Sequence, residues 1–278
     1  MSNLRWATLT FLFFYTSLSH PYRPPLSIFL PMTRQSTIQH NGQTHNLFLH
    51  PQGEFISDLV YFRNDFFERT TLEFCRQNFD LSYVLDVGAN IGNHSYFFSE
   101  ICGSKVIAIE PIPENFNLLS ANCPKAFPLN VALSDRVKTV NMAKIAECLG
   151  NCMIVEEEAI RSGQFALGQD CGHGTVEKLL SIPAIPLDLL NLQELTFIKL
   201  DVEGVELEVL AGAKNTLQAF SGVLMVEIHP NDGSFEKLAR GRYTRQELLD
   251  KIISFGFQCF YIDQYSNHFF SKPKVAVF

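Results

Sequence analysis

From residue 82 onward, short apolar runs alternate along the chain with longer amphipathic segments. The apolar runs predict buried strands at residues 83–88, 105–111, 126–135, 195–204 and 222–230. The segments between them predict helices at residues 93–103, 113–123 and 205–220. Near-continuous apolar strands separated by helices indicate a parallel sheet that is covered on both faces. Because such crossovers are right-handed, the pattern predicts a doubly wound α/β fold.

The last part of the chain departs from this alternation. A helix is predicted at residues 244–257, where Thr244 and Glu247 have the spacing of a capping box. Two apolar runs follow it, at residues 258–263 and 274–278. The segment between these runs is too short for a crossover helix, so we expect them to pair as an antiparallel hairpin.

The beginning of the chain has a different composition. Residues 6–18 form an apolar run after Arg5, and a proline-rich stretch continues to residue 31. The run is short for a membrane-spanning helix but has the length of a signal-peptide core. Three interpretations stay open: a signal sequence, a hydrophobic anchor, and an extension from a misassigned start codon. We expect a cytoplasmic protein, with secretion or membrane anchoring through residues 6–18 as the alternative.

Overall composition and charge narrow the function classes. The 278 residues are 46% hydrophobic and 18% charged, which is ordinary for a globular protein. The formal net charge of -7 opposes binding to a phosphate backbone, so nucleic acid is not an expected partner.

The seven cysteines favour buried, reduced thiols, because their number is odd and several lie in apolar helix or strand patterns, namely Cys75, Cys102, Cys123 and Cys259. Cys148, Cys152, Cys171 and His173 could together ligate zinc, but their spacing matches no common zinc module, so no metal site is predicted. In a secreted chain, disulfide bonds from Cys148 to Cys152 or to Cys171 would be the rival explanation.

Acidic side chains stand at the carboxyl ends of four predicted strands, at Asp86, Glu110, Asp201 and Glu227, and His229 follows the last of them. In an open α/β sheet, the carboxyl ends of the strands form the edge where ligands bind. One such acid could be a helix cap or a solvated loop charge. Four of them favour a shared ligand site.

The stretch VLDVGANIGNH, residues 84–94, predicts a strand, a glycine turn and the start of a helix. A dinucleotide-binding turn would begin with glycine where this chain has Asp86, and a carboxylate there opposes binding of a pyrophosphate. Asp86 suits a ligand that carries an ammonium and a sulfonium but no phosphate, such as S-adenosylmethionine. Gly88 and Gly92 would let the backbone approach this ligand without a Cβ atom. Glu110 is placed to accept hydrogen bonds from both ribose hydroxyls.

Five motifs resemble those of the FkbM family of S-adenosylmethionine-dependent methyltransferases, namely VLDVGANIGNHSYFFS, VIAIEPIPENFNLLSAN, NVALSD, FIKLDVEGVELEVLAGA and VLMVEIHP. The resemblance covers roughly residues 40–230. It implies a class I methyltransferase fold, which is a Rossmann-like doubly wound sheet of seven strands with a C-terminal antiparallel hairpin. It also implies O-methylation of a hydroxyl group on a sugar, a natural product or a glycan.

The resemblance also implies a domain organisation. Residues 40–68 resemble the family's leader, a small cap that helps to wall the acceptor site. We therefore expect an N-terminal extension at residues 1–31, a cap segment at 32–80 and the methyltransferase domain at 81–278. Residues 143–181 match no motif, and substrate specificity is expected to vary there.

The residues that the resemblance implies for cofactor binding surround the methionine, ribose and adenine parts of S-adenosylmethionine. They are, in that order, Asp86, Gly88, Asn90 and Gly92; Glu110; and Ala132 with Leu133.

The general base that removes the acceptor proton has four candidates, Asp201, Glu203, Glu227 and His229. The unperturbed histidine pKa of about 6.5 suits His229, although this residue could instead orient a carboxylate. Asp201 could bind the cofactor amine, or hold Mg²⁺ together with Glu227, which is less expected than direct base catalysis.

Glu206 and Glu208 are expected to be first-turn charges that the dipole of the following helix favours.

Two functions of other classes stay open. One is a nicotinamide-dependent oxidoreductase, which Asp86 disfavours, and the other is a cofactor-binding protein without catalysis. The expected partner is a small-molecule or glycan hydroxyl acceptor, and the sequence distinguishes neither the acceptor nor the oligomeric state.

Overall fold

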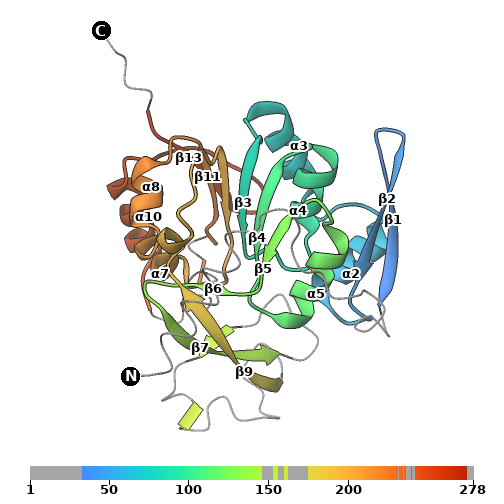
Figure 1. Ribbon diagram of the computed structural model, residues 1–278, viewed down its shortest axis with the longest axis horizontal. Helices are drawn as coiled ribbons and strands as arrows, with labels where there is room; N and C mark the ends of the chain where they lie inside the picture. Colours follow the sequence, from blue (N-terminus) through green and yellow to red (C-terminus); the bar gives the residue numbers. More distant parts are fainter. Residues whose placement is uncertain are drawn as a thin grey trace. The chain divides into compact units, whose positions relative to one another are not determined.

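The computed structural model describes residues 33–145, 153–155, 160–161, 175–230, 232–233, 235, 239 and 242–273, all within the unit Met32–Phe278. A seven-stranded sheet runs through this unit (Figure 1). From edge to edge its strands are β12 (Gln258–Ile262), β13 (Asn267–Ser271), β11 (Val223–Glu227), β10 (Phe197–Leu200), β3 (Tyr83–Val87), β4 (Lys105–Ile109) and β5 (Phe127–Leu129). Neighbouring strands are parallel except β13, which is antiparallel to β11 and β12. The predicted doubly wound sheet with a C-terminal antiparallel hairpin is confirmed.

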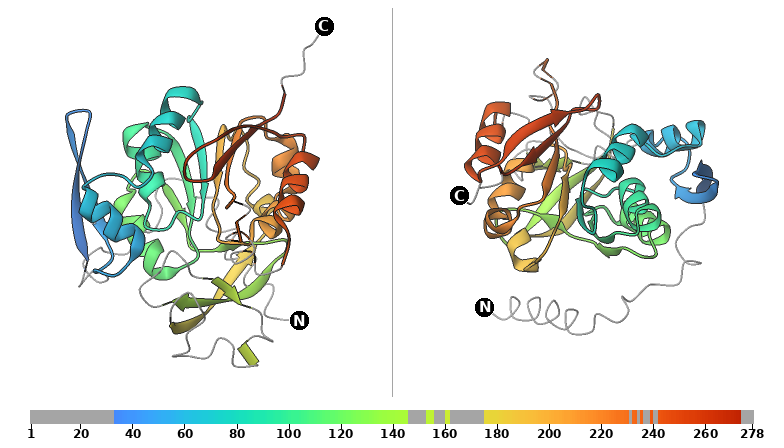
Figure 2. Two further views of the ribbon diagram at one scale, coloured as in Figure 1. Left: turned by 180° about the vertical axis from the view of Figure 1, so that it is seen from behind. Right: turned by 90° about the horizontal axis from the view of Figure 1, so that it is seen from above.

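Helices cover both faces of this sheet (Figures 1 and 2). One face carries α3 (Arg69–Asn78), α4 (Asn93–Tyr96) and α5 (Pro113–Asn122), and the other carries α7 (Glu206–Ala211), α8 (Lys214–Ala219) and α10 (Arg245–Ser254). This double cover explains the apolar runs, because every residue of β10 is buried. The predicted capping box is present at the start of α10, where Thr244 and Glu247 each accept a hydrogen bond from the other's backbone N–H.

The second strand of the C-terminal hairpin is β13, and not residues 274–278, which lie outside the described part of the chain. The apolar pattern assigned β13 to the connection because polar residues, Asn267 and His268, are buried in it. Each has a hydrogen-bond partner: Asn267 donates to Glu68 (3.1 Å), and Arg245 donates to His268 (3.0 Å). When a strand buries polar groups that are hydrogen-bonded, its sequence contains no continuous apolar run.

Two other elements differ from expectation. The helix expected at residues 205–220 is divided into α7 and α8 at Gly212, where a Cβ atom would lie 2.0 Å from the carbonyl oxygen of Ser134. The run at residues 126–135 is divided into β5 and β6 (Ala132–Leu133), and β6 belongs to a different sheet.

This second sheet has four strands, in the order β6, β9 (Val176–Ile185), β7 (Lys138–Ile145) and β8 (Met153–Val155), and the apolar pattern did not predict it. The long pair β7 and β9 is antiparallel and occupies the lower part of Figure 1. Part of the stretch at residues 143–181 is therefore sheet. The apolar face of this second sheet packs against Ile112, which brings β7 close to the carboxyl end of β4.

The N-terminal segment, defined here as residues 33–80, forms a hairpin and two helices that precede β3. The hairpin pairs β1 (Arg34–His40) with β2 (Gln43–Leu49), and α2 (Phe55–Arg63) and α3 follow it. Contacts group this segment with the rest of Met32–Phe278 in one compact unit. In the described part of the chain, no helix combines the length and the apolar composition that crossing a membrane requires.

Candidate functional site

Loops at the carboxyl ends of β3, β4 and β10 surround a pocket of about 720 Å³, counting its open mouth. Met142 of β7 and other apolar side chains form much of its wall, and no lysine or arginine is among the described residues that line it. Several residues predicted to bind ligand or to catalyse line the pocket, namely Gly88, Asn90, Glu110, Ala132, Leu133, Asp201 and Glu203. Asp86, Gly92, Glu227 and His229 do not.

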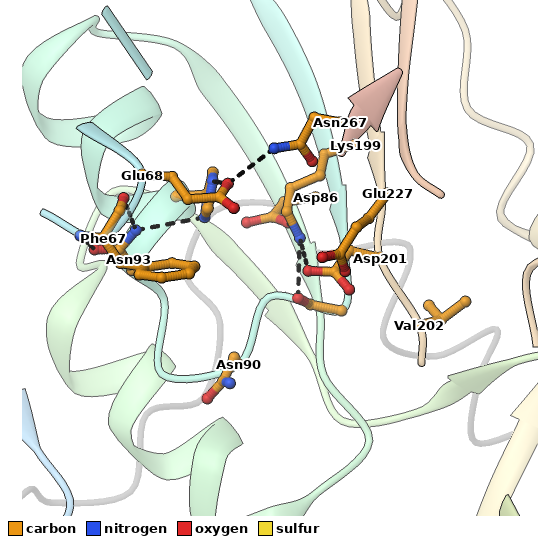
Figure 3. A network of polar contacts seen from close by, with 12 residues as sticks. Phe67, Glu68, Asp86, Asn90, Asn93, Lys199, Asp201, Val202, Glu227 and Asn267 are labelled. Carbon is orange, nitrogen blue, oxygen red and sulfur yellow. Dashed lines mark hydrogen bonds and ion pairs between the residues drawn. The ribbon is translucent and has the colours of Figure 1, made fainter. Parts of the chain in front are cut away.

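Asp86 lies in β3 with its side chain fully buried. Its carboxylate accepts a hydrogen bond from Ser95 (2.6 Å) and lies 3.4 Å from Nζ of Lys199 (Figure 3). Asp86 is therefore a buried charge beneath the glycine turn, and not the exposed pocket wall that the strand-end pattern suggested. The repulsion expected between Asp86 and a phosphate is also weaker than assumed, because Lys199 offsets the charge.

Lys199 in β10 is the counter-ion of the strand-end acids, and no sequence motif pointed to it. Its side chain is 3% exposed, and Nζ lies 3.2 Å from Asp201 and 3.3 Å from the carbonyl oxygen of Gly88. Burial opposes the charge, but the carboxylates of Asp201 and Asp86 raise the pKa of Lys199 above its usual value. A lysine inside a strand that is covered on both faces was the available signal, because such a lysine has to be paired.

Gly88 and Gly92 are required by contacts within the protein. Both have a positive φ, of 79° and 89°. A Cβ atom on Gly88 would lie 1.7 Å from the carbonyl oxygen of Asp201, so the turn after β3 and the loop after β10 touch backbone to backbone. A Cβ atom on Gly92 would lie 2.8 Å from Sγ of Cys123, which follows α5. The packing of these segments thus gives both glycines a reason within the protein, and Gly88 also lines the pocket.

Glu110 joins the glycine turn to the start of α5. One carboxylate oxygen accepts a hydrogen bond from the N–H of Asn90 (2.9 Å), and the other accepts one from the N–H of Ile112 (2.8 Å). Burial raises the pKa of Glu110 to about 7, although these two hydrogen bonds act in the opposite direction. The carboxyl group is therefore held in one orientation on the pocket wall.

Asp201 and Glu227 form a carboxyl pair at the ends of β10 and β11. Their side chains are hydrogen-bonded to each other and lie side by side in Figure 3. Burial and the charge of Asp201 raise the pKa of Glu227 well above its usual value. Burial also opposes ionisation of Asp201, but Lys199 and the hydrogen bond from Glu227 hold its pKa below the usual value. Glu227 is thus the protonated partner, and its Oε1 lies 3.6 Å from Nε2 of His229.

The loop after β10 has an unusual backbone, because Glu203 and Gly204 both have a left-handed φ, of 56° and 90°. Glu206 holds this loop: one carboxylate oxygen accepts from the N–H of Gly204 (3.2 Å) and of Val202 (3.4 Å), and the hydroxyl of Tyr243 donates to the other. Glu206 is a first-turn residue of α7, as expected, but it is buried, and burial raises its pKa. Its role in fixing the loop was not predicted.

Cys148, Cys152, Cys171 and His173, which were considered as zinc ligands, lie outside the described residues. Within the described ranges, no three histidine, cysteine, aspartate or glutamate side chains are grouped closely enough to hold a metal ion. The described cysteines are free thiols, and Cys259 is exposed, which corrects the expectation that it is buried.

Residues 86–262 match the model of the Methyltransferase FkbM domain, from the end of β3 to the end of β12. Hexuronic acid methyltransferase AglP from Haloferax volcanii is 32% identical over 150 residues, which cover 52% of this chain and 54% of that protein. Methyltransferase sdnD from Sordaria araneosa is 29% identical over 157 residues, which cover 47% of this chain and 60% of that protein. The chain thus spans little more than half the length of these curated relatives.

Similarity to solved structures is distant. Methyltransferase FkbM from Methylobacillus flagellatus shares 16% identity at a TM-score of 0.42, with 68% of this chain and 43% of that chain covered. A SAM-dependent O-methyltransferase from Thermotoga maritima shares 12% identity at a TM-score of 0.39, with 85% and 77% covered.

Proposed function

Because the chain belongs to the FkbM family of methyltransferases, we propose that it methylates a hydroxyl group of a sugar or of another small-molecule or glycan acceptor. The methyl donor of the family is S-adenosylmethionine, which supplies a methyl group on a positively charged sulfur. The family assignment replaces the nicotinamide-dependent alternative. The observation that carries the proposal is the carboxyl pair of Asp201 and Glu227 beside an acid-lined pocket.

The residues of the pocket fit this cofactor. Its described lining has carboxylates and no basic side chain, which suits a ligand with two cationic groups and no phosphate. In our assignment the methionine part lies against Gly88 and Asn90, the ribose hydroxyls donate to Glu110, and the adenine contacts Ala132, Leu133 and Met142. Asp86 and Gly92 support this surface from behind.

The carboxyl pair is suited to receive the acceptor proton. Asp201 lines the pocket and is ionised, so it can accept a hydrogen bond from a hydroxyl and orient its oxygen. As the oxygen forms its new bond to carbon, the hydroxyl proton becomes acidic and passes to Asp201. Glu227 already holds a proton, because its pKa is raised, so it can pass that proton to His229 and then take the new one from Asp201. His229, with a third of its side chain exposed, would release the proton to solvent, which returns Asp201 to its ionised form. Methyl transfer otherwise requires mainly positioning.

A sugar acceptor is supported by one relative, the hexuronic acid methyltransferase AglP. Because the similarity covers 54% of that protein, hexuronic acid is the first acceptor to test and not a conclusion.

The cofactor is tested by isothermal titration of the protein with S-adenosylmethionine, S-adenosylhomocysteine and NAD. We expect both sulfur compounds to bind and NAD not to bind. Binding of NAD but of neither sulfur compound would overturn the assignment.

The acceptor is tested with S-adenosylmethionine that carries a tritiated methyl group, added to hexuronic acids and to fractionated extracts of the source organism. Label transferred to a hydroxyl forms an ether and survives mild alkali, whereas a methyl ester is cleaved. Alkali-labile label would contradict hydroxyl methylation.

The role of Asp201 as the general base is tested by substitution. Asp201→Asn should bind S-adenosylhomocysteine like the wild type and lose most of its turnover, by about 10²-fold or more.

A further inference from the structure

The N-terminal segment is fastened to the glycine turn by the side chain of Asn93. The Oδ1 atom of Asn93 accepts from the N–H of Phe67 (3.0 Å), and its Nδ2 atom donates to the carbonyl oxygen of Phe67 (3.0 Å). The amide thus pairs with one residue of the segment as a neighbouring strand would. Because the oxygen of the Asn93 amide has to face the N–H of Phe67 and its nitrogen the carbonyl oxygen, the orientation of the amide is fixed.

The fixed amide determines the hydrogen bonds of the next residue. Nδ2 of Asn93 also lies 3.4 Å from Nδ1 of His94, so this ring nitrogen is the acceptor. Nε2 of His94 then carries the proton and donates to Oε2 of Glu68 (3.2 Å). A second donor, Nδ2 of Asn267, reaches the same oxygen from β13 (3.1 Å).

Two donors therefore saturate Oε2 of Glu68, while Oε1 accepts no hydrogen bond from the described part of the chain. Glu68 is 7% exposed and has a left-handed φ of 53°, a conformation that is costly for a residue with a Cβ atom. Such a conformation persists only where the surroundings enforce it, and the Phe67 clamp and the two donors do so. Figure 3 shows the Glu68 carboxylate extending from the N-terminal segment towards Asn267 and the group of Lys199, Asp201 and Glu227.

We propose that Glu68 is an acceptor-binding residue, whose free carboxylate oxygen receives a hydrogen bond from a hydroxyl group of the acceptor. The proposal rests on the proposed function and deepens it, since it gives the acceptor a second contact besides Asp201. A carboxylate with one oxygen saturated and the other open recognises a hydroxyl donor and disfavours an anionic group at the same place. The acceptor class is accordingly one with more than one hydroxyl, as in a sugar ring.

The test compares Glu68→Gln with Glu73→Gln. Glu73 is a matched control, because it is also a carboxylate of the N-terminal segment paired with a histidine, His40, at 2.6 Å, but its other partner is Arg76 and it does not contact the site. For each variant we would measure S-adenosylhomocysteine affinity, the thermal unfolding midpoint and the kinetics of tritiated methyl transfer to the acceptor fraction that the wild type labels. We expect Glu68→Gln to keep the affinity within about threefold and to lose about 10- to 150-fold in kcat/KM, as for a hydrogen bond to a charged group. Glu73→Gln should keep both.

Three results would overturn the role of Glu68: a kcat/KM equal to that of Glu73→Gln, a loss of cofactor affinity that matches the loss of kcat/KM, or full kcat/KM in Glu68→Asp. The last variant keeps the charge and shortens the side chain, and it serves if Glu68→Gln does not fold. A wild-type protein that binds the cofactor but labels no hydroxyl would overturn the proposed function and the role of Glu68 together. If the wild type and Glu68→Gln labelled the acceptor to the same extent, only the role of Glu68 would be overturned.

Discussion

Lys199 is the residue on which the charge balance of the site depends, because it lies within 3.4 Å of both Asp86 and Asp201 and is 3% exposed. Replacing it by methionine would leave these carboxylates near each other without a cation. We expect Lys199→Met to lose about 3–5 kcal/mol of unfolding free energy at neutral pH, measured by urea denaturation.

The loss should be smaller at low pH. Without Lys199, burial and mutual repulsion would raise the folded-state pKa of the carboxyl groups above their unfolded values, so the variant would be relatively more stable where they are protonated. The double variant Lys199→Met with Asp86→Asn should recover part of the loss. A single variant as stable as the wild type at pH 7 would show that the ion pairs contribute little.

An added methyl group would meet a closer neighbour at Gly88 than at Gly92, Gly212 or Gly222. Gly88→Ala would place Cβ 1.7 Å from the Asp201 carbonyl oxygen, at φ +79°, and we expect a loss of about 2–5 kcal/mol from strain and overpacking together. Gly42→Ala is the control, since φ there is +77° and no atom lies within 4 Å of the added Cβ. It should lose about 1–2 kcal/mol, for the backbone alone. If the two variants lost the same unfolding free energy in urea denaturation, the backbone near Asp201 would have shifted to remove the close contact at little cost.

Glu110 should give the protein without cofactor a pH-dependent stability. Its folded-state pKa of about 7 lies above the ordinary value of 4.5, so the folded form retains a proton that the unfolded form loses first. The stabilisation is fully present below about pH 4.5 and is lost as the pH rises through 7, by about 3 kcal/mol in total. Urea denaturation of the wild type and of Glu110→Gln at pH 5 and pH 8 measures this slope. The same slope in both proteins would assign it to another group.

At the scale of elements, the loop between β10 and α7 depends on a hydrogen bond from outside it. Tyr243 donates to Glu206, and Glu206 accepts from the N–H groups of Gly204 and Val202. Tyr243→Phe should therefore lose about 1–3 kcal/mol of stability and increase amide hydrogen exchange at Gly204. Tyr61→Phe on α2 is the control, because Tyr61 is 40% exposed. Unchanged exchange at Gly204 would show that the loop holds its shape without Tyr243.

Most helices and strands of the seven-stranded sheet could be predicted from the sequence. The parallel strands and their helices were predictable, because burial on both faces makes each strand a continuous apolar run. The convergence of Glu110 and Asp201 followed, since parallel strands end at one edge. Buried polar residues hid β13, and the short strand β6 was merged with its neighbour. Glu68 was missed because its partners, His94 and Asn267, lie 26 and 199 positions away. Lys199 was missed although Asp201 is only two positions away, because the strand was assigned from its apolar residues and the other partner, Asp86, is distant in sequence.

At the scale of the whole molecule, the N-terminal segment and the C-terminal hairpin are joined by hydrogen bonds. Thr71 hydrogen-bonds to Asp263, and Glu68 to Asn267. A protein that begins at Met32 should therefore keep the unfolding midpoint and the S-adenosylhomocysteine affinity of the full chain, whereas one that begins at residue 81 should lose both. Thermal denaturation and isothermal titration of the two proteins check this. A lower midpoint for the protein that begins at Met32 would show that residues 1–31 contribute to stability.

The contact between Glu68 and Asn267 joins residues that are 199 positions apart, and this separation sets an order of events during biosynthesis. At about 5–20 residues per second, the ribosome needs roughly 10–40 s to proceed from one residue to the other. During this interval the nascent chain carries Glu68 with one of its two donors absent. The contact that joins the N-terminal segment to β13 can therefore form only after these intervening residues have been made, and in our proposal the acceptor contact at Glu68 waits for the same step.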